Sequence, residues 1–506
     1  MIKVAIIGAG SMGFTRRIVG DLLTIPELRD SMELSLHDIS AQNLDMVYKL
    51  CRRDMEANKV GSKISATLNR RQALKGAKYI FCVVRVGGLE AFKHDVDIPL
   101  KYGVDQCVGD TLCAGGIMYA QRTIPAMLDF CRDAEEVADK DCLFISHVNP
   151  MAMNTWACNE YGGVPFVGLC HGVQHGGRQI ADALKIPRKE LDYICAGINH
   201  QTWFVQLRHK GKDVSGKVLA AFEKHPVFSQ QEKVRIDMMR RFGYYSTESN
   251  GHLSEYLPWY RKRTQEIKKW IDLSSWINGE TGGYLRICTE ERNWFKTDFP
   301  KWMKAAPKVY SQENRSGEHG AFIVESLETG RPYRGHFNVQ NNGVITNLPD
   351  DSIVEVPGYV DGNGLNIPVV GDLPLGCAAV CNASISVQRL AMEAAVHGDI
   401  DLLRQAMMMD PLVGAVCNPP EIWQMTDEML VALAPWLPQY RKEIEKAKKR
   451  LSKGPRIPTK NTRGAARLKV RTVQEMRRKA ALDQVDNPDK AAVDKKRAMA
   501  NMKKRK

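Results

Sequence analysis

The chain has 506 residues, of which 44% are hydrophobic and 26% are charged, so it has enough apolar residues to fold around a large core. Its formal net charge of +14 is uneven: residues 441–506 hold 24 Lys and Arg against seven Asp and Glu, a net charge of +17 that leaves −3 for residues 1–440. The body is therefore close to neutral, which argues against a nucleic-acid-binding protein.

Cysteine usage and hydropathy bear on the cellular compartment. Thirteen cysteines, an odd number, are scattered without the spacing of a disulfide framework. The apolar stretch at residues 2–7 is too short for a signal peptide and runs into a glycine loop, and no apolar run is long enough to span a bilayer. We therefore expect a cytoplasmic protein with reduced thiols and no membrane partner.

The first part of the chain alternates between strand and helix patterns. Helical patterns such as Met12–Leu23 and Met118–Asp129 separate several of the strands. The predicted strands are Lys3–Ile7, Glu33–His37, Tyr79–Arg85, Cys142–Val148, Pro165–Leu169 and Tyr193–Gly197. This alternation predicts an α/β fold in which residues 1–198 form a Rossmann-like domain with a doubly wound parallel sheet.

Two further regions follow along the chain. Residues 199–440 mix helical stretches with a strand-and-turn stretch at 330–372, which predicts a second α+β domain that covers the carboxyl ends of the first sheet. We expect this second domain to carry the substrate-binding and oligomerisation surfaces. Residues 441–506 shift to Lys, Arg and Ala with almost no aromatic residues, so we expect a basic tail that is helical or disordered.

A glycine-rich turn follows the first predicted strand and opens a helix. Its sequence, Gly8-Ala9-Gly10-Ser11-Met12-Gly13, matches the G-x-G-x-x-G pattern of dinucleotide-binding turns in the context that the pattern requires. The first glycine allows the tight turn, the second lets the backbone approach a pyrophosphate, and the third lets helix and strand pack closely. The free N–H groups of the helix N-terminus favour the phosphates.

The residue at the end of the second predicted strand distinguishes between NAD and NADP as cofactor. Asp38 stands at its end, 25 residues after Gly13. Its carboxylate can accept hydrogen bonds from an adenosine ribose and would repel a 2′-phosphate, so NAD is favoured over NADP. A glycine turn that binds no cofactor is the alternative. The predicted cofactor-binding residues are Gly8, Gly10, Ser11, Met12, Gly13 and Asp38.

A cysteine and a histidine stand at two other predicted strand ends. Cys170 falls where the strand Pro165–Leu169 stops, and His200 closes the run that begins at Tyr193. Side chains at the carboxyl ends of parallel strands face the crevice where a nicotinamide would lie. Sulfur with imidazole suits a transition metal better than Mg²⁺ or Ca²⁺. From spacing alone, a packed thiol and a hydrogen-bonded histidine are more common than a metal site.

Three polar segments lie around Asp110, Asn149 and Glu248, and each alone is more typical of a turn or a helix cap. Taken together with these segments, the motifs above resemble glycoside hydrolase family four. Several matches in register over about residues 1–440 are more specific than any one motif. The matching segments are Gly8-Ala9-Gly10-Ser11, Asp110-Thr111-Leu112, Gly115-Gly116-Ile117, Asn149–Thr155, Cys170-His171-Gly172-Val173, Cys195–His200, Thr247-Glu248-Ser249 and Met407–Pro411.

The resemblance implies a glycosidase that depends on NAD and on a divalent metal, with Mn²⁺ as the expected ion. Family members cleave sugars by transient oxidation and are an exception to two-carboxylate catalysis. The implied order is oxidation at C3, elimination at C1 after proton loss from C2, addition of water, and reduction. Cys-His-Gly-Val resembles the branch that removes α-linked galacturonic acid, and Cys-His-Ser-Val goes with α-galactosidases, so we expect an α-galacturonide or α-galactoside substrate. We also expect a homo-oligomer, either a dimer or a tetramer.

The resemblance further implies roles for single residues. Cys170 and His200 would be the two protein ligands of the metal. Asn149 would hold a sugar hydroxyl near the nicotinamide. Glu248 would be the catalytic base, with Asp110 as a second candidate for proton transfer.

His171 stands where the branch of the family that acts on phosphorylated sugars has an acidic residue. It would bind substrate or act as an acid near neutral pH. A uronate substrate would also need an Arg or Lys for its carboxylate.

Two other functions compete with this one. A 2-hydroxy-acid dehydrogenase would share the glycine turn, but Cys170 and His200 would have no role in it. A protein that binds anionic polymers through the basic tail would do so in a salt-dependent way. A solvated extension is the favoured interpretation of the tail.

Overall fold

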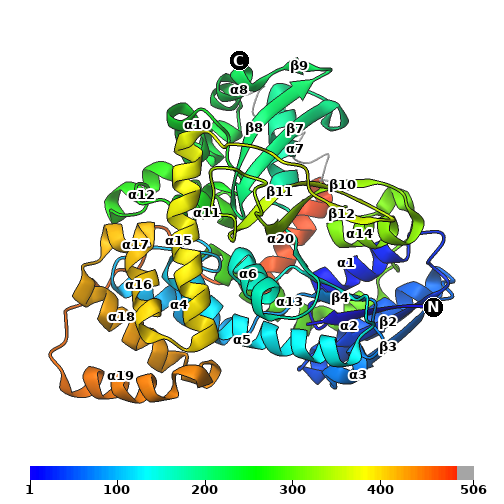
Figure 1. Cartoon of the computed structure of the whole chain (residues 1–506), viewed down its shortest axis with the longest axis horizontal. Helices are drawn as coiled ribbons and strands as arrows, with labels where there is room; N and C mark the ends of the chain where they lie inside the picture. The colour runs from blue at the N-terminus through cyan, green and yellow to red at the C-terminus, as the bar shows by residue number, and fades with distance from the viewer. Residues whose placement is uncertain (487–506) are drawn as a thin grey trace.

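The computed structural model describes residues 1–486 of the chain, and the part of the predicted basic tail beyond residue 486 lies outside the described residues. The chain forms one twelve-stranded mixed sheet with helices packed on both faces (Figure 1). Among the described residues, no helix has the length and hydropathy needed to cross a membrane.

The first half of the sheet is parallel and has the strand order β3-β2-β1-β4-β5-β6. This is the order of a Rossmann-like dinucleotide-binding sheet, so the predicted fold class is confirmed. The strands are β1 (Ile2–Ile7), β2 (Met32–His37), β3 (Lys63–Thr67), β4 (Tyr79–Cys82), β5 (Leu143–Ser146) and β6 (Phe166–Gly168). Strand β3 is absent from the predicted strands, because it is an edge strand in which no residue is buried and the apolar pattern is weak.

The second half of the sheet is antiparallel. The order continues β10-β11-β7-β8-β9, with β12 paired to β11. These strands are β7 (Leu191–Ile198), β8 (Gln201–His209), β9 (Lys212–Asp213), β10 (Tyr333–Gln340), β11 (Ile353–Asp361) and β12 (Gly364–Asn366). The prediction that the strand Tyr193–Gly197 belongs to the parallel sheet is wrong. This strand is β7, and it pairs antiparallel with both neighbours, because β10 and β11 come between it and β6.

One row of residues across the sheet explains how the site is built. Gly168 of β6 pairs with Asn338 of β10, Asn338 pairs with Glu355 of β11, and Glu355 pairs with Gly197 of β7. Gly168 and Gly197 each lie at the carboxyl end of their strand, and the two strands approach the row from opposite sides. Their carboxyl ends therefore meet, although the strands run in opposite directions.

The helices of the first part of the chain pack on the parallel strands. Ser40 caps α2, because its hydroxyl accepts a hydrogen bond from the N–H of Asn43. Helices α1 and α14 share one apolar cluster with β1, β2 and β4, and α5 packs on the other face. These helices are α1 (Met12–Leu22), α2 (Ala41–Ala57), α3 (Arg70–Leu74), α4 (Gly88–Lys101), α5 (Cys113–Val137), α6 (Met151–Tyr161) and α7 (Gly172–Leu184).

The largest apolar cluster continues from residues 91–157 into residues 196–444. In it, the long helix α5 packs against α15, α16 and α17. The division at residue 198 therefore passes through a shared core, and it stays a prediction. The later helices are α8 (Val218–Lys224), α9 (Phe228–Gln231), α10 (Lys233–Phe242), α11 (Asn250–Tyr256), α12 (Thr264–Trp270), α13 (Gly283–Lys304), α14 (His319–Thr329), α15 (Leu375–His397), α16 (Ile400–Met409), α17 (Pro411–Val416) and α18 (Pro419–Ala432).

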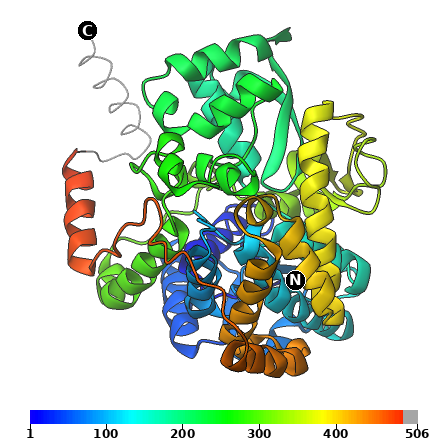
Figure 2. The same ribbon diagram turned by 90° about the vertical axis from the view of Figure 1, so that its left-hand side faces the viewer.

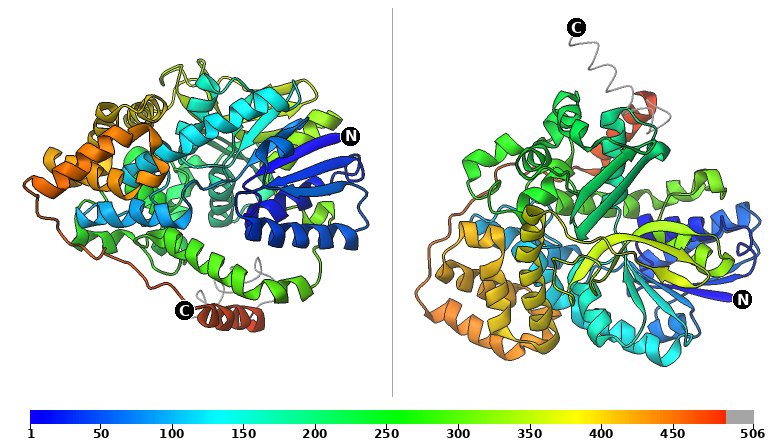
Figure 3. Two further views of the ribbon diagram at one scale, coloured as in Figure 1. Left: turned by 90° about the horizontal axis from the view of Figure 1, so that it is seen from below. Right: turned by 45° about the horizontal axis from the view of Figure 1, so that its top comes forward.

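The described part of the basic tail lies against the body. It consists of α19 (Arg441–Lys453), a strap over residues 454–472, and α20 (Val473–Asp486). The strap runs along the outside of the molecule from α19 to α20, which lies beside α13 (Figures 2 and 3). Basic tail residues pair with carboxylates of the body in Arg450–Asp427, Arg467–Asp97, Arg471–Glu290 and Arg477–Asp298.

Candidate active site

The two converging strand ends bring together a thiol, an imidazole and a carboxylate. Cys170 follows β6, His200 follows β7, and Glu248 precedes α11. Their ligand atoms all lie within 4.8 Å of one another. Cys170 Sγ is 3.7 Å from Glu248 Oε1, and His200 Nε2 is 3.9 Å from the same oxygen. The predicted pair of metal ligands is thus found in one place, and Glu248 supplies a third donor.

The surrounding residues fix the His200 ring. Its Nδ1 lies 3.1 Å from Thr111 Oγ1 and 3.3 Å from the hydroxyl of Tyr256, so Nε2 is the nitrogen that faces the cluster. Hydrogen bonds of this kind orient a metal-binding histidine and select its tautomer. A sulfur, an imidazole nitrogen and a carboxylate oxygen form a donor set that suits a first-row transition metal, so the residues fit such an ion.

The ligand side chains are largely shielded from solvent, and burial acts in the same direction on the thiol and the carboxyl group. Burial raises the pKa of the Cys170 thiol well above its usual value, so thiolate formation and cation binding would be coupled. Burial also raises the pKa of Glu248, but the charges of His200, His252 and other neighbours outweigh it and hold the pKa at about 2. Glu248 is therefore ionised near neutral pH.

Asp110 and Asn149 lie side by side next to this cluster. Asn149 Nδ2 is 3.3 Å from both carboxylate oxygens of Asp110, and Arg85 Nη2 donates to Asp110 Oδ2 at 3.0 Å. The Thr111 hydroxyl donates to Asp110 at 3.0 Å and also contacts His200. Burial raises the pKa of Asp110, but the Arg85 charge and two nearby histidines lower it overall. One polar network thus joins the Asp110–Asn149 pair to the Cys170 cluster.

A buried carboxylate holds the loop that carries Asp110. Glu255 accepts hydrogen bonds from three consecutive backbone N–H groups, those of Cys107, Val108 and Gly109, at 2.5–2.9 Å. Glu255, His252 and Tyr256 are not among the predicted site residues, because apolar and polar residues alternate on this short helix without a motif.

Comparison with known proteins identifies the family. A model described as "Family 4 glycosyl hydrolase" matches residues 3–186, and its C-terminal domain model matches residues 195–413. The chain belongs to glycosyl hydrolase family 4. An alpha-galactosidase of Rhizobium meliloti (strain 1021) is 59% identical over 94% of this chain and 97% of its own length. Membership in this family argues against the 2-hydroxy-acid dehydrogenase alternative.

Solved structures of glycosidases resemble this family 4 chain in fold. A 6-phospho-alpha-glucosidase from gut microorganisms, in complex with NAD and glucose-6-phosphate, is 26% identical and has a TM-score of 0.73 over 86% of this chain and 99% of its own. A second one, in complex with NAD and Mn²⁺, is 20% identical and has a TM-score of 0.70 over 86% of this chain and 98% of its own.

The glycine turn of this family 4 chain has the expected position between β1 and α1. Gly8 has a φ of +86°, which favours glycine, and a Cβ at Gly10 would press on the Asp38 carboxylate. Asp38 accepts the N–H of Gly10 at 2.8 Å, so it helps to hold the turn. The expected reason for Gly13 is not seen: Gly13 is exposed, and a Cβ there would meet no atom within 4 Å.

His171 lies apart from the Cys170–His200–Glu248 cluster. Its Nε2 is 2.6 Å from Glu318 Oε2, and its ring stacks on His147. The sequence analysis named His171 but missed Glu318 and His147, which no motif connects to it. Its predicted roles in substrate binding and as an acid, and those of the other predicted site residues, stay predictions.

Proposed function

We propose that this family 4 glycosidase hydrolyses α-galactosides, with α-galacturonides as the alternative. The observation that carries the proposal is the cluster of Cys170, His200 and Glu248 beside the Asp110–Asn149 pair. The 59% identical relative, described as an alpha-galactosidase, supports the neutral sugar as substrate.

The charges around the site also favour a neutral sugar. Arg85 already pairs with Asp110 at 3.0 Å, and Arg235 pairs with Glu232 at 2.7 Å. A uronate carboxylate that bound either arginine would compete with a protein carboxylate, whereas a galactoside needs only hydrogen-bonding partners for its hydroxyl groups. Arg85 keeps a buried Nη1 without a hydrogen-bond partner, and we propose that this N–H group donates to a sugar oxygen.

We propose NAD and Mn²⁺ as the cofactors, as the names of the solved family 4 glycosidases suggest. The turn at residues 8–13 would hold the NAD pyrophosphate with backbone N–H groups, and Asp38 would hold the adenosine ribose. Cys170, His200 and Glu248 would hold the cation. When bound, NAD⁺ supplies a hydride acceptor and the cation supplies a Lewis acid that stabilises negative charge on the sugar.

The protein residues would orient the sugar and move its protons. Asn149 would position a sugar hydroxyl, since its amide lies beside Asp110 at the edge of the cluster. Glu248 and Asp110 are the candidates for removing the C2 proton, because their lowered pKa values keep both carboxylates ionised. Glu248 would act through the oxygen that does not bind the cation. His171 would contact the substrate through the ring nitrogen that does not face Glu318.

Nitrophenyl glycosides test this proposal. Protein stripped of NAD and metal should cleave nitrophenyl α-galactoside only after both are restored, and α-galacturonide much more slowly. Cys170→Ser should abolish hydrolysis, and Cys142→Ser, which alters a buried thiol at the start of β5, should not. Cleavage by the stripped protein, or a preference for the galacturonide, would contradict the proposal.

A further inference from the structure

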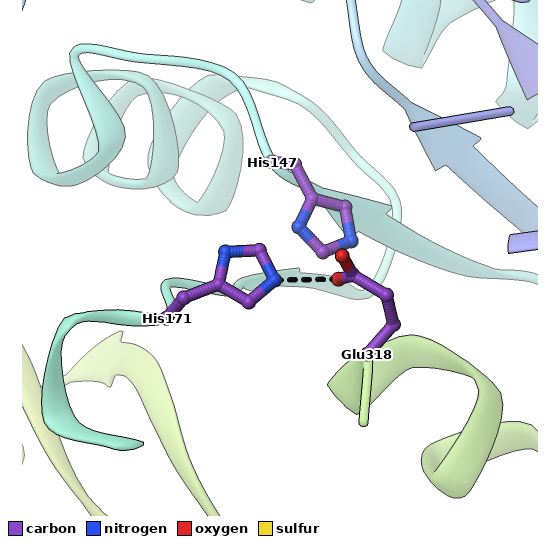
Figure 4. A group of neighbouring side chains, drawn as sticks. All are labelled: His147, His171 and Glu318. Carbon is purple, nitrogen blue, oxygen red and sulfur yellow. Dashed lines mark hydrogen bonds and ion pairs between the residues drawn. The ribbon is translucent and has the colours of Figure 1, made fainter. Parts of the chain in front are cut away.

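A second cluster of metal-ligating side chains lies outside the Cys170 site. His147 follows β5, His171 precedes α7, and Glu318 precedes α14. One ligand atom from each lies within 4.8 Å of the other two. Figure 4 shows the two imidazole rings and the carboxylate converging from three separate elements. None of the three residues belongs to the Cys170–His200–Glu248 cluster.

The His147 imidazole is the group of this cluster that lacks hydrogen-bond partners. Both of its ring nitrogens are shielded from solvent, and neither has a hydrogen-bond partner. Leaving a buried polar group without a partner is unfavourable, so such groups usually face a water, an ion or a ligand. Burial lowers the pKa of His147 to about 4, so its ring is neutral and has a lone pair to offer.

Glu318 supplies the negative charge of the cluster. Its side chain is buried, its Oε2 accepts from His171 Nε2 at 2.6 Å, and its Oε1 accepts from Arg17 Nη1 at 2.8 Å. Burial raises the pKa of this carboxyl, but the hydrogen bond and charge of His171 outweigh it and hold the pKa at about 2. Arg17 thus helps to fix the orientation of the carboxylate through Oε1.

We propose that His147, His171 and Glu318 form a second site, for a divalent transition-metal ion. Two imidazoles and one carboxylate are a donor set that such ions prefer, and they leave positions open for water. The His171 side chain is 40% exposed, which gives an ion a path from solvent. The site would join the loop after β5 to the N-termini of α7 and α14.

This site is compatible with the role proposed for His171 in catalysis. The ion would take the place of the hydrogen between His171 Nε2 and Glu318, and the neutral ring would carry its single N–H on Nδ1. In Figure 4 that second nitrogen points away from Glu318 and His147. His171 can therefore bind the ion through one nitrogen and donate to a sugar oxygen through the other.

Titration of the full-length, NAD-loaded protein with Co²⁺ tests the proposal. A thiolate ligand gives bound Co²⁺ a charge-transfer absorption band. Co²⁺ at the Cys170 site should therefore show this band, and Co²⁺ at the second site, which has no thiolate, should not. Wild-type protein should bind two Co²⁺ per chain. His147→Gln and Glu318→Gln should each bind one and keep the charge-transfer band.

Two further variants make the outcome specific. Cys170→Ser should lose the band and still bind one Co²⁺, so a failure of the Cys170 site and a failure of this one are read separately. His209→Gln is the matched control. His209 also pairs with a glutamate, Glu190, at 2.9 Å, but among the described residues this pair belongs to no group of three metal-ligating side chains. Equal Co²⁺ binding by wild type, His147→Gln and Glu318→Gln would overturn the proposal.

Discussion

At the residue scale, Gly172 lies directly against the carboxylate of Glu248. A Cβ at this glycine would collide with Oε1 of Glu248. The carboxylate cannot simply retreat, because His200 and His252 lie within 4 Å of its two oxygens. The absence of a side chain at residue 172 is therefore part of the site.

Gly172→Ala tests this reading. Alanine is favourable in the first turn of α7, so any loss of thermal stability should come from the collision with Glu248 and not from the helix. Displacing Glu248 should lower kcat/KM by about 10²-fold, the effect of a shift of about 1 Å in a catalytic group. Steady-state hydrolysis and Mn²⁺ affinity measure the effect. Gly216→Ala is the control, because a Cβ there meets no atom within 4 Å; unchanged activity in Gly172→Ala would count against the role of Glu248.

Residue types at strand ends explain why part of the site could be predicted. Cys170 and His200 stood out because a thiol and an imidazole follow apolar runs. Glu248 came only from the family resemblance, since a carboxylate in a polar loop is ordinary. His147 and Glu318 could not be paired, because they are far apart in sequence and meet only through packing of α14 beside α1.

At the element scale, five of the six strands of the parallel half could be predicted to within a few residues, and only β3 could not. Continuous apolar runs mark strands that are buried on both faces. The direction of β7 could not be predicted, because it depends on β10 and β11, which lie more than 130 residues later and insert between β6 and β7. An apolar run in the sequence predicts that a strand is buried, but it does not predict which strands lie on either side of it.

The contact between α20 and α13 gives a pH-dependent prediction. Hydrogen bonds from Arg477 lower the pKa of Asp298 to about 2, below the value of about 3.9 in an unfolded chain. A lowered folded-state pKa stabilises the fold above the unfolded pKa, and this contribution is lost as the pH falls toward the folded value. Arg477→Gln should therefore lower the Tm at neutral pH, and its difference from wild type should shrink below about pH 5.

Thermal unfolding across this pH range measures the difference. The neighbouring, exposed Arg478→Gln serves as the control. A Tm difference for Arg477→Gln that stays constant or grows as the pH falls would contradict the assigned ion pair.

At the scale of the whole molecule, the basic tail divides into two parts. Residues 441–480 pack on the body: Ile444 and Ala447 are buried, and Arg450 and Arg471 pair with carboxylates of the body. Residues 487–506 contain eight Lys and Arg and two Asp, a net charge of +6. The family models end at residue 413, before either part begins.

Two truncations separate these parts. A chain that ends at residue 486 should keep full hydrolysis and bind an anionic resin more weakly, because it loses six net positive charges. A chain that ends at residue 440 should have a lower Tm, because buried apolar contacts and ion pairs are lost with it. Loss of hydrolysis on removing residues 487–506 would show that the tail takes part in catalysis.

Hydrolysis in D₂O tests the central claim most directly. If the enzyme removes the C2 proton and water later returns one, the galactose released from nitrophenyl α-galactoside will carry deuterium at C2 and none at C3, and NMR of the product will show both. Hydrolysis by two carboxylates would leave the hydrogen at C2 in place. Product with full protium at C2, formed by protein loaded with NAD and Mn²⁺, would contradict the account.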